Sequence, residues 1–435
     1  MAWDFSTEPE FQAQLDWMDA FVREEIEPMD LVFRDPAAPF DPNSTARKVM
    51  RPLQRVVKER GLWACHLGPE LGGQGYGQLK LGLMNEILGR SRFAPTVFGT
   101  QAPDTGNAEI LARFGTEQQK QQYLQPLLDG DIVSCFSMTE PQAGADPGQF
   151  TCRAELQDGE WVLNGEKWFA SHACIAEFLI VVCITDPEVP VHEGSTTIIV
   201  PRDTPGLEII RNTAVGPKDV LGSGVHGYLR FENCRVPHEN ALGGIGEGFK
   251  VAQSRLGGGR IHHAMRTVGM LNKAMAMMSE RAVSRITKGE RLADKQMVQE
   301  KIADSYIQIT QFRLHVLYAA WLLDQDKAYT RRVRREISAI KAAMPGVLRD
   351  VIYRALHLHG SLGMSNETPL MDMWQYVPEM GIVDGPTEVH KVSVARDLLR
   401  NVAPAPGVFP TYFVPDTRAA AERKFAEYLN GEEAA

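Results

Sequence analysis

The spacing of apolar residues changes twice along the 435-residue chain. In the first part, apolar side chains recur at every third or fourth position, as Phe11, Leu15 and Met18 do, which is the period of an amphipathic helix. We therefore expect an N-terminal helical domain over residues 1–130.

Short β-branched and apolar runs replace this helical pattern between residues 131 and 243. Phe178–Val182 and Thr196–Val200 are such runs, and pairs such as Asn164-Gly165 supply turn signals between them. The pattern predicts a central β-domain over 131–243, built on a small antiparallel sheet or barrel.

Helical spacing returns after residue 244 and predicts a C-terminal helical bundle over 244–402. A helix expected over 332–358 contains Pro345, which should kink or interrupt it because proline lacks an N–H and its ring crowds the preceding turn. The tail over 403–435 is first proline-rich and then reads as a short charged helix. The predicted fold class is thus mainly α with a central β-domain.

Composition and charge narrow the classes of protein. Acidic residues outnumber basic ones by 55 to 46, a net charge of −9 that argues against nonspecific nucleic-acid binding. The longest clean apolar run, 178–184, is far shorter than the ~20 residues of a membrane-spanning helix. The acidic N-terminus lacks the features of a signal or transit peptide. The six cysteines form no C-x-x-C pair, so we expect free thiols and a cytoplasmic protein.

Two patterns suggest chemistry that their surroundings do not support. Gly222–Gly227 matches G-x-G-x-x-G, but it lies among expected strands and does not open a helix, so we interpret it as a turn. The neighbours His262 and His263, and the pair His357 and His359, lack the spacing of metal ligands on one helical face. We expect these histidines to be structural and no metal to be bound.

A more specific motif is Cys135-Phe-Ser-Met-Thr-Glu-Pro-Gln-Ala-Gly-Ala-Asp146, whose Thr-Glu-Pro-x-Ala-Gly part is a turn that exposes backbone N–H groups and a hydroxyl. At this motif the chain resembles the acyl-CoA dehydrogenase family. The resemblance continues in family order and covers about residues 5 to 400. The further segments that carry it are Leu163–Ser171, Phe231–Pro237, Arg255–Ile261, Ser284–Gly289 and Leu358–Gly363.

Within that family the chain is similar to the type that higher animals fuse to a phosphotransferase-like kinase domain. The shared features are Gly259–His263, Pro345 inside its helix, and Asp384–His390. The chain starts directly at the dehydrogenase part, so we expect a stand-alone enzyme. The resemblance implies the acyl-CoA dehydrogenase fold, with FAD at a subunit interface of a homotetramer or homodimer.

The resemblance also implies a reaction, the dehydrogenation of acyl-CoA thioesters to trans-2-enoyl-CoA in fatty-acid β-oxidation. In the family a carboxylate removes the α-proton while the β-hydrogen leaves as hydride to flavin N5, and electrons pass to an electron-transferring flavoprotein. The family's usual base is a glutamate followed by Gly-Thr, where this chain has Asp384, Gly385 and Pro386. Asp384 is therefore the expected base, and its backbone N–H would stabilise the charge that develops on the thioester oxygen.

The same resemblance assigns binding residues by position. In the family the segment that matches Cys135–Asp146 lines the isoalloxazine ring of the flavin, and the segment that matches Leu163–Ser171 packs on it. The residues that match Arg285 and Gln296 reach the pyrophosphate and adenosine from a neighbouring subunit. The expected cofactor contacts are Phe136, Met138, Thr139, Gly144, Ala145, Phe169, Ser171, Arg285, Gln296, His357, Gly360, Pro386 and Glu388, and the expected substrate contacts are Arg260, Val383 and Gly385.

The chain departs from the family pattern next to the base. Aspartate is one methylene shorter than glutamate, a deficit of ~1.5 Å, and Val383 stands where the family has an aromatic residue, so we expect a roomier site. Rival interpretations stay open. The enzyme could be an acyl-CoA oxidase, or could eliminate a substituent from, for example, a hydroxylated acyl-CoA. A catalytically idle flavoprotein used for interaction is the non-enzyme alternative, against which the carboxylate at 384 argues.

Overall fold

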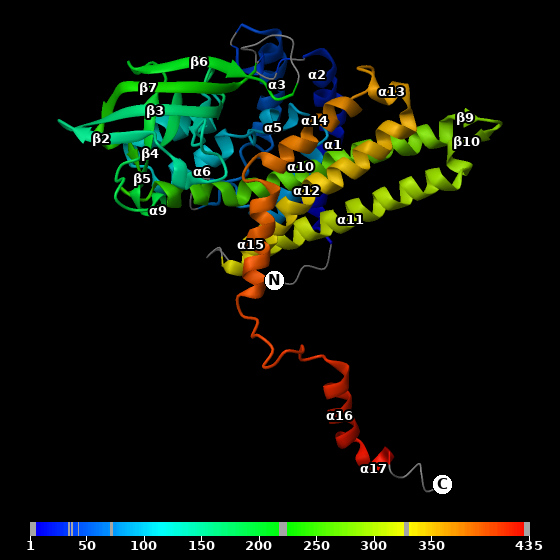
Figure 1. Ribbon diagram of the computed structural model, residues 1–435. Helices are drawn as coiled ribbons and strands as arrows, with labels where there is room; N and C mark the ends of the chain where they lie inside the picture. Colours follow the sequence, from blue (N-terminus) through cyan, green and yellow to red (C-terminus); the bar gives the residue numbers. More distant parts are fainter. Residues whose placement is uncertain are drawn as a thin grey trace.

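The computed structural model runs from a helical N-terminal part through a sheet domain to a bundle of long helices (Figure 1). This order of elements confirms the predicted fold class, whereas the exact domain boundaries stay predictions. The residues that the structure describes are 6–33, 35, 38–41, 43–69, 73–216, 224–325 and 330–429.

The N-terminal part buries the apolar stripe that the sequence shows. Phe11 and Met18 are buried in one core with residues of the later helices, such as Phe98, because helical spacing places them on one face. Its elements are α1 (Pro9–Phe21), a π-helical turn (Val22–Ile26), α2 (Glu27–Val32), a 3₁₀ turn (Ala38–Phe40), α3 (Thr45–Glu59), α4 (Gly77–Leu88), α5 (Ala94–Val97), α6 (Asp104–Phe114), α7 (Glu117–Gln119), a second π-helical turn (Lys120–Leu124) and α8 (Gln125–Leu128).

The middle part is an eight-stranded sheet in the order β6-β7-β3-β1-β4-β5-β8, with β2 paired to β3 and β4. Most pairs are antiparallel, as expected, but β1 runs parallel to β4. The elements are β1 (Ser134–Ser137), β2 (Arg153–Gln157), β3 (Glu160–Ser171), β4 (Phe178–Ile184), α9 (Val191–Gly194), β5 (Ser195–Pro201), β6 (Leu207–Thr213), β7 (His226–Pro237) and β8 (Ala241–Leu242), with 3₁₀ turns at Pro147–Gln149 and His238–Asn240. Residues 217–223, and so Gly222 of the G-x-G-x-x-G pattern, lie outside the described residues; Gly227 lies in β7.

The C-terminal part is a bundle of long helices around a large apolar core. The 37 residues of α10 make a helix of ~55 Å at 1.5 Å per residue. Of the two expected effects of Pro345, interruption of the helix is wrong, because α12 continues through it from Arg331 to His359, and a kink stays a prediction. The elements are α10 (Gly248–Ser284), β9 (Ile286–Thr287), β10 (Glu290–Arg291), a 3₁₀ turn (Leu292–Asp294), α11 (Gln296–Gln325), α12 (Arg331–His359), α13 (Ser361–Met364), α14 (Leu370–Ile382) and α15 (Thr387–Leu399).

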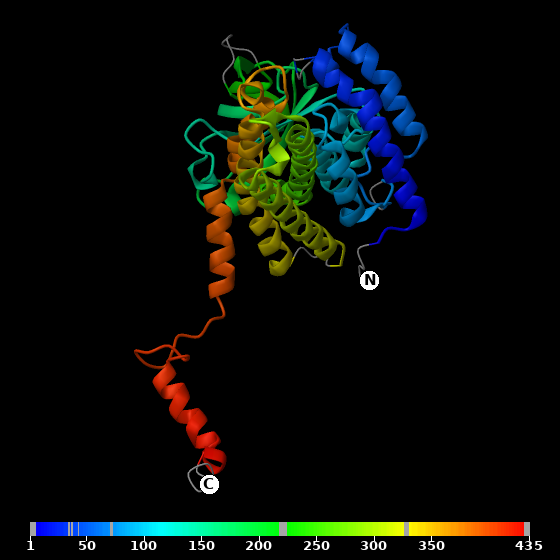
Figure 2. The ribbon, with the colours of Figure 1, turned by 90° about the vertical axis from the view of Figure 1, so that its right-hand side faces the viewer.

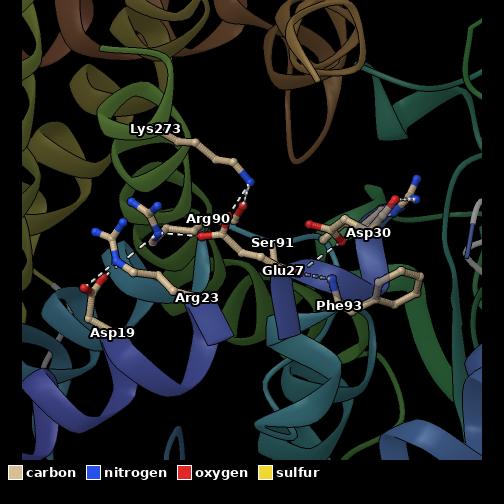
Figure 3. Close-up of polar contacts among 9 residues, drawn as sticks. Asp19, Arg23, Glu27, Asp30, Arg90, Ser91, Phe93 and Lys273 are labelled. Atoms are coloured by element: carbon tan, nitrogen blue, oxygen red, sulfur yellow. Dashed lines mark hydrogen bonds and ion pairs between the residues drawn. The ribbon is translucent and has the colours of Figure 1, made fainter. Parts of the chain in front are cut away.

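Charged side chains join the N-terminal helices to α10. The Glu27 carboxylate lies 2.8 Å from Arg90 Nε through one oxygen and 2.8 Å from Lys273 Nζ through the other (Figure 3). Beside it, Ser91 Oγ donates to Asp30, and burial raises the pKa of Asp30 to about 6. These contacts fix the N-terminal helices on the long helix that also carries residues of the candidate site.

The last described segment is an arm that leads away from the body of the molecule (Figures 1 and 2). It follows α15 and contains α16 (Val414–Lys424) and α17 (Ala426–Leu429). Val408 and Tyr412 are fully or almost fully exposed there. No helix among the described residues is long and apolar enough to cross a membrane.

Candidate active site

The expected base lies in the tight turn between α14 and α15. Asp384 adopts a positive φ of 55° and Gly385 one of 106°, which together reverse the chain from one helix into the other. A side chain at Gly385 would meet His390 Nε2 at 2.8 Å, so both conformation and space require glycine there. The turn presents the Asp384 side chain with 18% of its surface exposed, so this carboxylate is largely buried but reachable.

The backbone carbonyl of Asp384 is held by two side chains. Arg260 Nε, on α10, donates to it at 3.1 Å, and the His390 ring, on the first turn of α15, contacts it through Nε2 at 3.2 Å. Arg260, an expected substrate contact, therefore reaches the turn through the backbone of Asp384. Val383 ends α14 and packs against the core of the bundle.

Cations surround the Asp384 carboxylate. Burial raises its pKa, but the basic side chains that face it lower it by more, so the pKa lies below the usual value of an aspartate. These side chains are His263, Arg255, Arg260 and Lys341. Burial lowers the pKa of His263 to about 4 and that of Lys341 to about 8. The His263 ring is then neutral at pH 7, and the lasting positive charge comes from the two arginines and the lysine.

No described residue donates a hydrogen bond to this carboxylate, and its nearest basic nitrogen is His263 Nε2, 3.8 Å from Oδ2. The Lys341 ammonium is used elsewhere, since it donates to the backbone carbonyl of Met380 in α14. Asp384 is thus ionised at neutral pH and keeps its acceptor positions open.

Arg255 connects Asp384 with the β-domain. Its guanidinium lies 4.2 Å from the centre of the Phe136 ring, and its Nε donates to Asn107 at 2.9 Å. Asn107 in turn donates to Ser134 at the start of β1. Arg255 also acts electrostatically on Asp384, so this one side chain lies near both Phe136 and Asp384.

The β-domain presents an aromatic side chain at a break in its sheet. The β3–β7 register shifts between Lys167 and Ala170, and Phe169, inside this irregularity, has a φ of 52° and is 39% exposed. A bulge of this kind turns a side chain away from the regular alternation. The Phe169 ring lies 5.4 Å from that of His226, whose Nδ1 is 2.9 Å from Ser171 Oγ. Phe169 and Ser171 therefore both lie beside His226 on one surface.

The Thr-Glu-Pro-x-Ala-Gly turn adjoins this surface. The backbone N–H of Trp168 donates to the Thr139 carbonyl at 2.8 Å, and Lys167 Nζ donates to the Met138 carbonyl at 2.8 Å. Gly144 and Ala145 are exposed, and a side chain at Gly144 would meet no atom within 4 Å. This turn is thus bound through its backbone carbonyls to Trp168 and Lys167, which lie in the segment Leu163–Ser171.

Other expected cofactor residues lie elsewhere. His357 on α12 lines a cavity of about 320 Å³, together with residues of α11. Gly360 ends α12 with a φ of 64°. Pro386 is the N-cap residue of α15, and Glu388 is exposed in the first turn of that helix.

Arg285 and Gln296 are far from Asp384 within one chain. Both are exposed, and they flank the β9–β10 hairpin at the far end of α10 from the sheet domain (Figure 1). Along α10, the 25 residues from Arg260 to Arg285 correspond to ~37 Å. The structure therefore does not bring these two residues to the base within one chain.

Comparison with known proteins decides the family. Three family models match in succession: acyl-CoA dehydrogenase N-terminal domain over residues 8–131, middle domain over 135–234 and C-terminal domain over 246–399. A curated relative, "Probable acyl-CoA dehydrogenase FadE2" of Mycobacterium tuberculosis, is 41% identical over 398 residues, which cover 90% of this chain and 92% of the relative. The chain belongs to the acyl-CoA dehydrogenase family. It is thus an acyl-CoA dehydrogenase enzyme, and the resemblance of its motifs is confirmed.

Relatives of the animal type are also similar. "Acyl-CoA dehydrogenase family member 11" of Rattus norvegicus is 39% identical over 360 residues, which cover 82% of this chain and 45% of the relative. The chain therefore spans less than half the length of the rat acyl-CoA dehydrogenase relative.

Solved structures share the acyl-CoA dehydrogenase fold. The butyryl-CoA dehydrogenase of Megasphaera elsdenii is 27% identical with a TM-score of 0.77, covering 92% of this chain and all of that chain. A chain in a structure of the electron-transferring flavoprotein of Acidaminococcus fermentans is 29% identical with a TM-score of 0.77 and the same coverage.

Sequence reasoning missed four basic residues of this acyl-CoA dehydrogenase site: Arg255, His263, Lys341 and His390. The expectation that His263 is only structural is incomplete, because it lies beside Asp384. The spacing held a partial signal, because His263 follows Arg260 by three residues, about one helical turn, on α10. Nothing in the sequence linked Lys341 to them, since it lies on α12. The structure contains no cluster of three or more metal-ligating side chains among its described residues.

Proposed function

We propose that this acyl-CoA dehydrogenase uses FAD to convert acyl-CoA thioesters to trans-2-enoyl-CoA, with Asp384 as the base that removes the α-proton. The observation that carries the proposal is the Asp384 carboxylate itself, which is largely buried, ionised and free of hydrogen-bond donors among the described side chains. A base needs such an open acceptor position within reach of substrate.

The basic side chains around Asp384 would stabilise the negative charge that forms on the substrate when the α-proton is removed. Removal of the α-proton moves negative charge onto the thioester oxygen, and Arg255, Arg260 and Lys341 keep the region positive as Asp384 becomes neutral. The Asp384 backbone N–H belongs to the same turn and would donate to that oxygen. In this proposal the carboxylate accepts the proton, and the cations and the N–H stabilise the charge left behind.

The residues of the β-domain fit FAD. Phe169 offers an exposed ring for stacking, and Gly144 leaves space for a close approach. Trp168 Nε1 and Ser137 Oγ are buried without a partner among the described residues, as expected of groups that meet a polar ligand. Phe136, Met138, Thr139 and Ser171 would complete this surface. When bound, FAD would take up the β-hydrogen as a hydride.

The separation of the two ends of α10 bears on the oligomeric state. Arg285 and Gln296 would reach FAD only from a second copy of the chain, so we propose a homodimer or homotetramer with the cofactor at its interface, where His357, Gly360, Pro386 and Glu388 would contribute. Electrons would pass to an electron-transferring flavoprotein, and a structural relative comes from such an assembly. A cytoplasmic location stays a prediction.

The decisive experiment is anaerobic flavin bleaching. The purified protein is expected to be yellow, to release noncovalent FAD on denaturation, and to lose its flavin colour on addition of at least one member of a series of straight, branched and hydroxylated acyl-CoAs. A colourless protein that does not take up FAD would overturn the cofactor assignment. A yellow protein that no acyl-CoA bleaches would favour the idle flavoprotein, and rapid peroxide formation in air would favour the oxidase.

A further inference from the structure

The backbone conformation of Asp384 is unfavourable by itself. A positive φ of 55° is unfavourable for most residues with a side chain; aspartate tolerates this region better than most, but only glycine adopts it freely. A conformation of this kind persists only where its surroundings hold it. The question is therefore which contacts hold Asp384.

Two side chains from different helices meet at the Asp384 carbonyl. Arg260 Nε reaches it from α10 at 3.1 Å, and His390 Nε2 reaches it from α15 at 3.2 Å. A carbonyl oxygen only accepts, so the His390 ring must carry its proton on Nε2 and donate it. The two donors together fix the direction in which the peptide after Asp384 points.

The His390 ring is held firmly in this position. The residue is 5% exposed, its backbone N–H donates to the Pro386 carbonyl as the first turn of α15 begins, and the absence of a side chain at Gly385 makes room for Nε2. A ring packed in this way keeps its donor at one place.

We propose that His390 is a positioning residue of the dehydrogenase: its Nε2–H, together with Arg260, locks Asp384 in the left-handed conformation that presents the carboxylate to substrate. The inference rests on the proposed role of Asp384 as base. His390 touches neither the carboxylate nor the reacting atoms, and it acts through the backbone of Asp384. A base displaced by ~1 Å can lose on the order of 10²-fold in rate. Loss of the hydrogen bond from His390 is therefore expected to affect the rate strongly, even though it is a single bond.

The test compares His390→Gln with His390→Met. Glutamine and methionine have nearly the same shape, and the glutamine amide places an N–H donor near the position of Nε2, whereas methionine has none. We expect His390→Gln to keep the anaerobic flavin-reduction rate within about threefold of wild type, and His390→Met to lower it by about 10- to 100-fold with little change in KM, because the loss lies in the transition state. Equal rates in the two variants would overturn the proposal.

Asn85→Leu serves as the matched control. Asn85 is 1% exposed and donates to the Leu81 carbonyl at 2.9 Å, so this variant removes the same type of buried bond from α4. Whatever its effect on the melting temperature, this variant should leave flavin reduction within about twofold of wild type, because Asn85 lies outside the catalytic turn. A similar loss of rate in Asn85→Leu would show that general destabilisation explains the effect.

Crystal structures of the two His390 variants separate this inference from the proposed function. Asp384 should keep its positive φ in His390→Gln and leave it in His390→Met, whether or not any acyl-CoA reduces the wild-type flavin. An unchanged Asp384 in His390→Met would overturn the positioning role alone. If His390→Met does not fold, Arg260→Met removes the other donor to the same carbonyl, and Asp384 should then leave its positive φ in the crystal structure of that variant; an unchanged φ would overturn the proposal.

Discussion

Two buried carboxylates of the chain, Glu140 in the β-domain and Asp384 between α14 and α15, have opposite surroundings. Glu140 is 1% exposed and accepts from the N–H groups of Thr151 and Cys152, from the Gln142 amide, and from Lys167 Nζ at 2.9 Å. Asp384 also faces positive charge, but none of the described residues donates to its carboxylate. One carboxylate is saturated with donors and the other is open.

This difference distinguishes Glu140, a carboxylate that stabilises the fold, from Asp384, a carboxylate that is open to substrate. For both carboxylates burial raises the pKa, but it is outweighed by Lys167 and backbone N–H groups at Glu140 and by the basic side chains at Asp384, so both are ionised at neutral pH. The shift of the pKa alone therefore does not tell them apart. What distinguishes them is whether the acceptor positions are occupied, because an occupied carboxylate has no position left for a substrate proton.

The largest expected effect comes from the open carboxylate. Asp384→Asn should retain FAD but lower the rate constant of flavin reduction by acyl-CoA by about 10²- to 10⁴-fold, since it removes the general base. Stopped-flow absorbance of the flavin under anaerobic conditions measures this rate. Retention of more than about a tenth of the wild-type rate would mean that another residue removes the proton.

The same measurement has a pH dependence with a definite sign. Because the pKa of Asp384 lies below its usual value, the base form persists as the pH falls. We expect the wild-type rate to show no loss from protonation of the base between about pH 7 and pH 5. A loss of the wild-type rate over that range that is absent in Asp384→Asn would contradict the lowered pKa of Asp384.

The saturated carboxylate should respond through stability. Lys167→Met leaves Glu140 buried without its cation, and breaking a buried pair in this way destabilises by about 3–5 kcal/mol. Both side chains of the pair are fully buried, so solvent does not replace the lost contact. Urea denaturation followed by fluorescence measures the change.

Glu140→Gln combined with Lys167→Met is the control for this prediction. The double variant should recover part of the lost stability, because it no longer buries an unpaired charge. If Lys167→Met alone costs less than about 1 kcal/mol, Glu140 is not the structural charge that its contacts indicate.

A third carboxylate, that of Asp104 at the start of α6, is hydrogen-bonded like Glu140 but has a raised pKa. Its substitution should give the smallest of the expected effects. The carboxylate accepts from Ser134 N at 2.8 Å and from Gln101 Nε2 at 2.9 Å, yet burial still raises its pKa to about 6. Between the usual value and about pH 6, the folded state binds more protons than the unfolded state, so stability falls as the pH rises. Asp104→Asn removes this contribution, and its stability relative to wild type should rise by up to about 3 kcal/mol from pH 4 to pH 7.

The measurement for Asp104→Asn is the melting temperature of both proteins across that pH range. The substitution keeps a hydrogen bond to Gln101, because Gln101 Oε1 is otherwise without a partner among the described residues and can accept from the amide introduced at position 104 once the Gln101 side chain turns over. Parallel melting curves for the two proteins at every pH would contradict the raised pKa of Asp104.

Much of the site was predictable from local sequence. Phe136, Phe169 and Ser171 were placed by motifs, and the structure does bring Phe169 and Ser171 to one surface and Phe136 next to Arg255. Asp384 was placed by its position before glycine, and the required turn is present. Local sequence could place these residues because each belongs to a short segment whose turn chemistry is readable from a few positions, while their roles stay predictions.

The expected interruption at Pro345 is not seen, and the interpretation of His263 as a structural residue is incomplete, for a shared reason. Whether proline interrupts a helix depends on the packing that surrounds it, and α12 is held from both sides by the bundle. Whether a histidine is structural depends on which segment lies across from it, and Asp384 is more than a hundred residues from His263 in sequence.

The sequence by itself determined the order of helices and strands, the family, and the carboxylate that serves as candidate base, because periodicity, turn residues and motifs are properties of neighbouring positions. Only the tertiary structure decided what surrounds that carboxylate. Arg255, Arg260 and His263 come from α10, Lys341 from α12 and His390 from α15. Their convergence depends on how three helices pack, and electrostatic effects fall off over a few ångströms, so no pattern along the chain could show it.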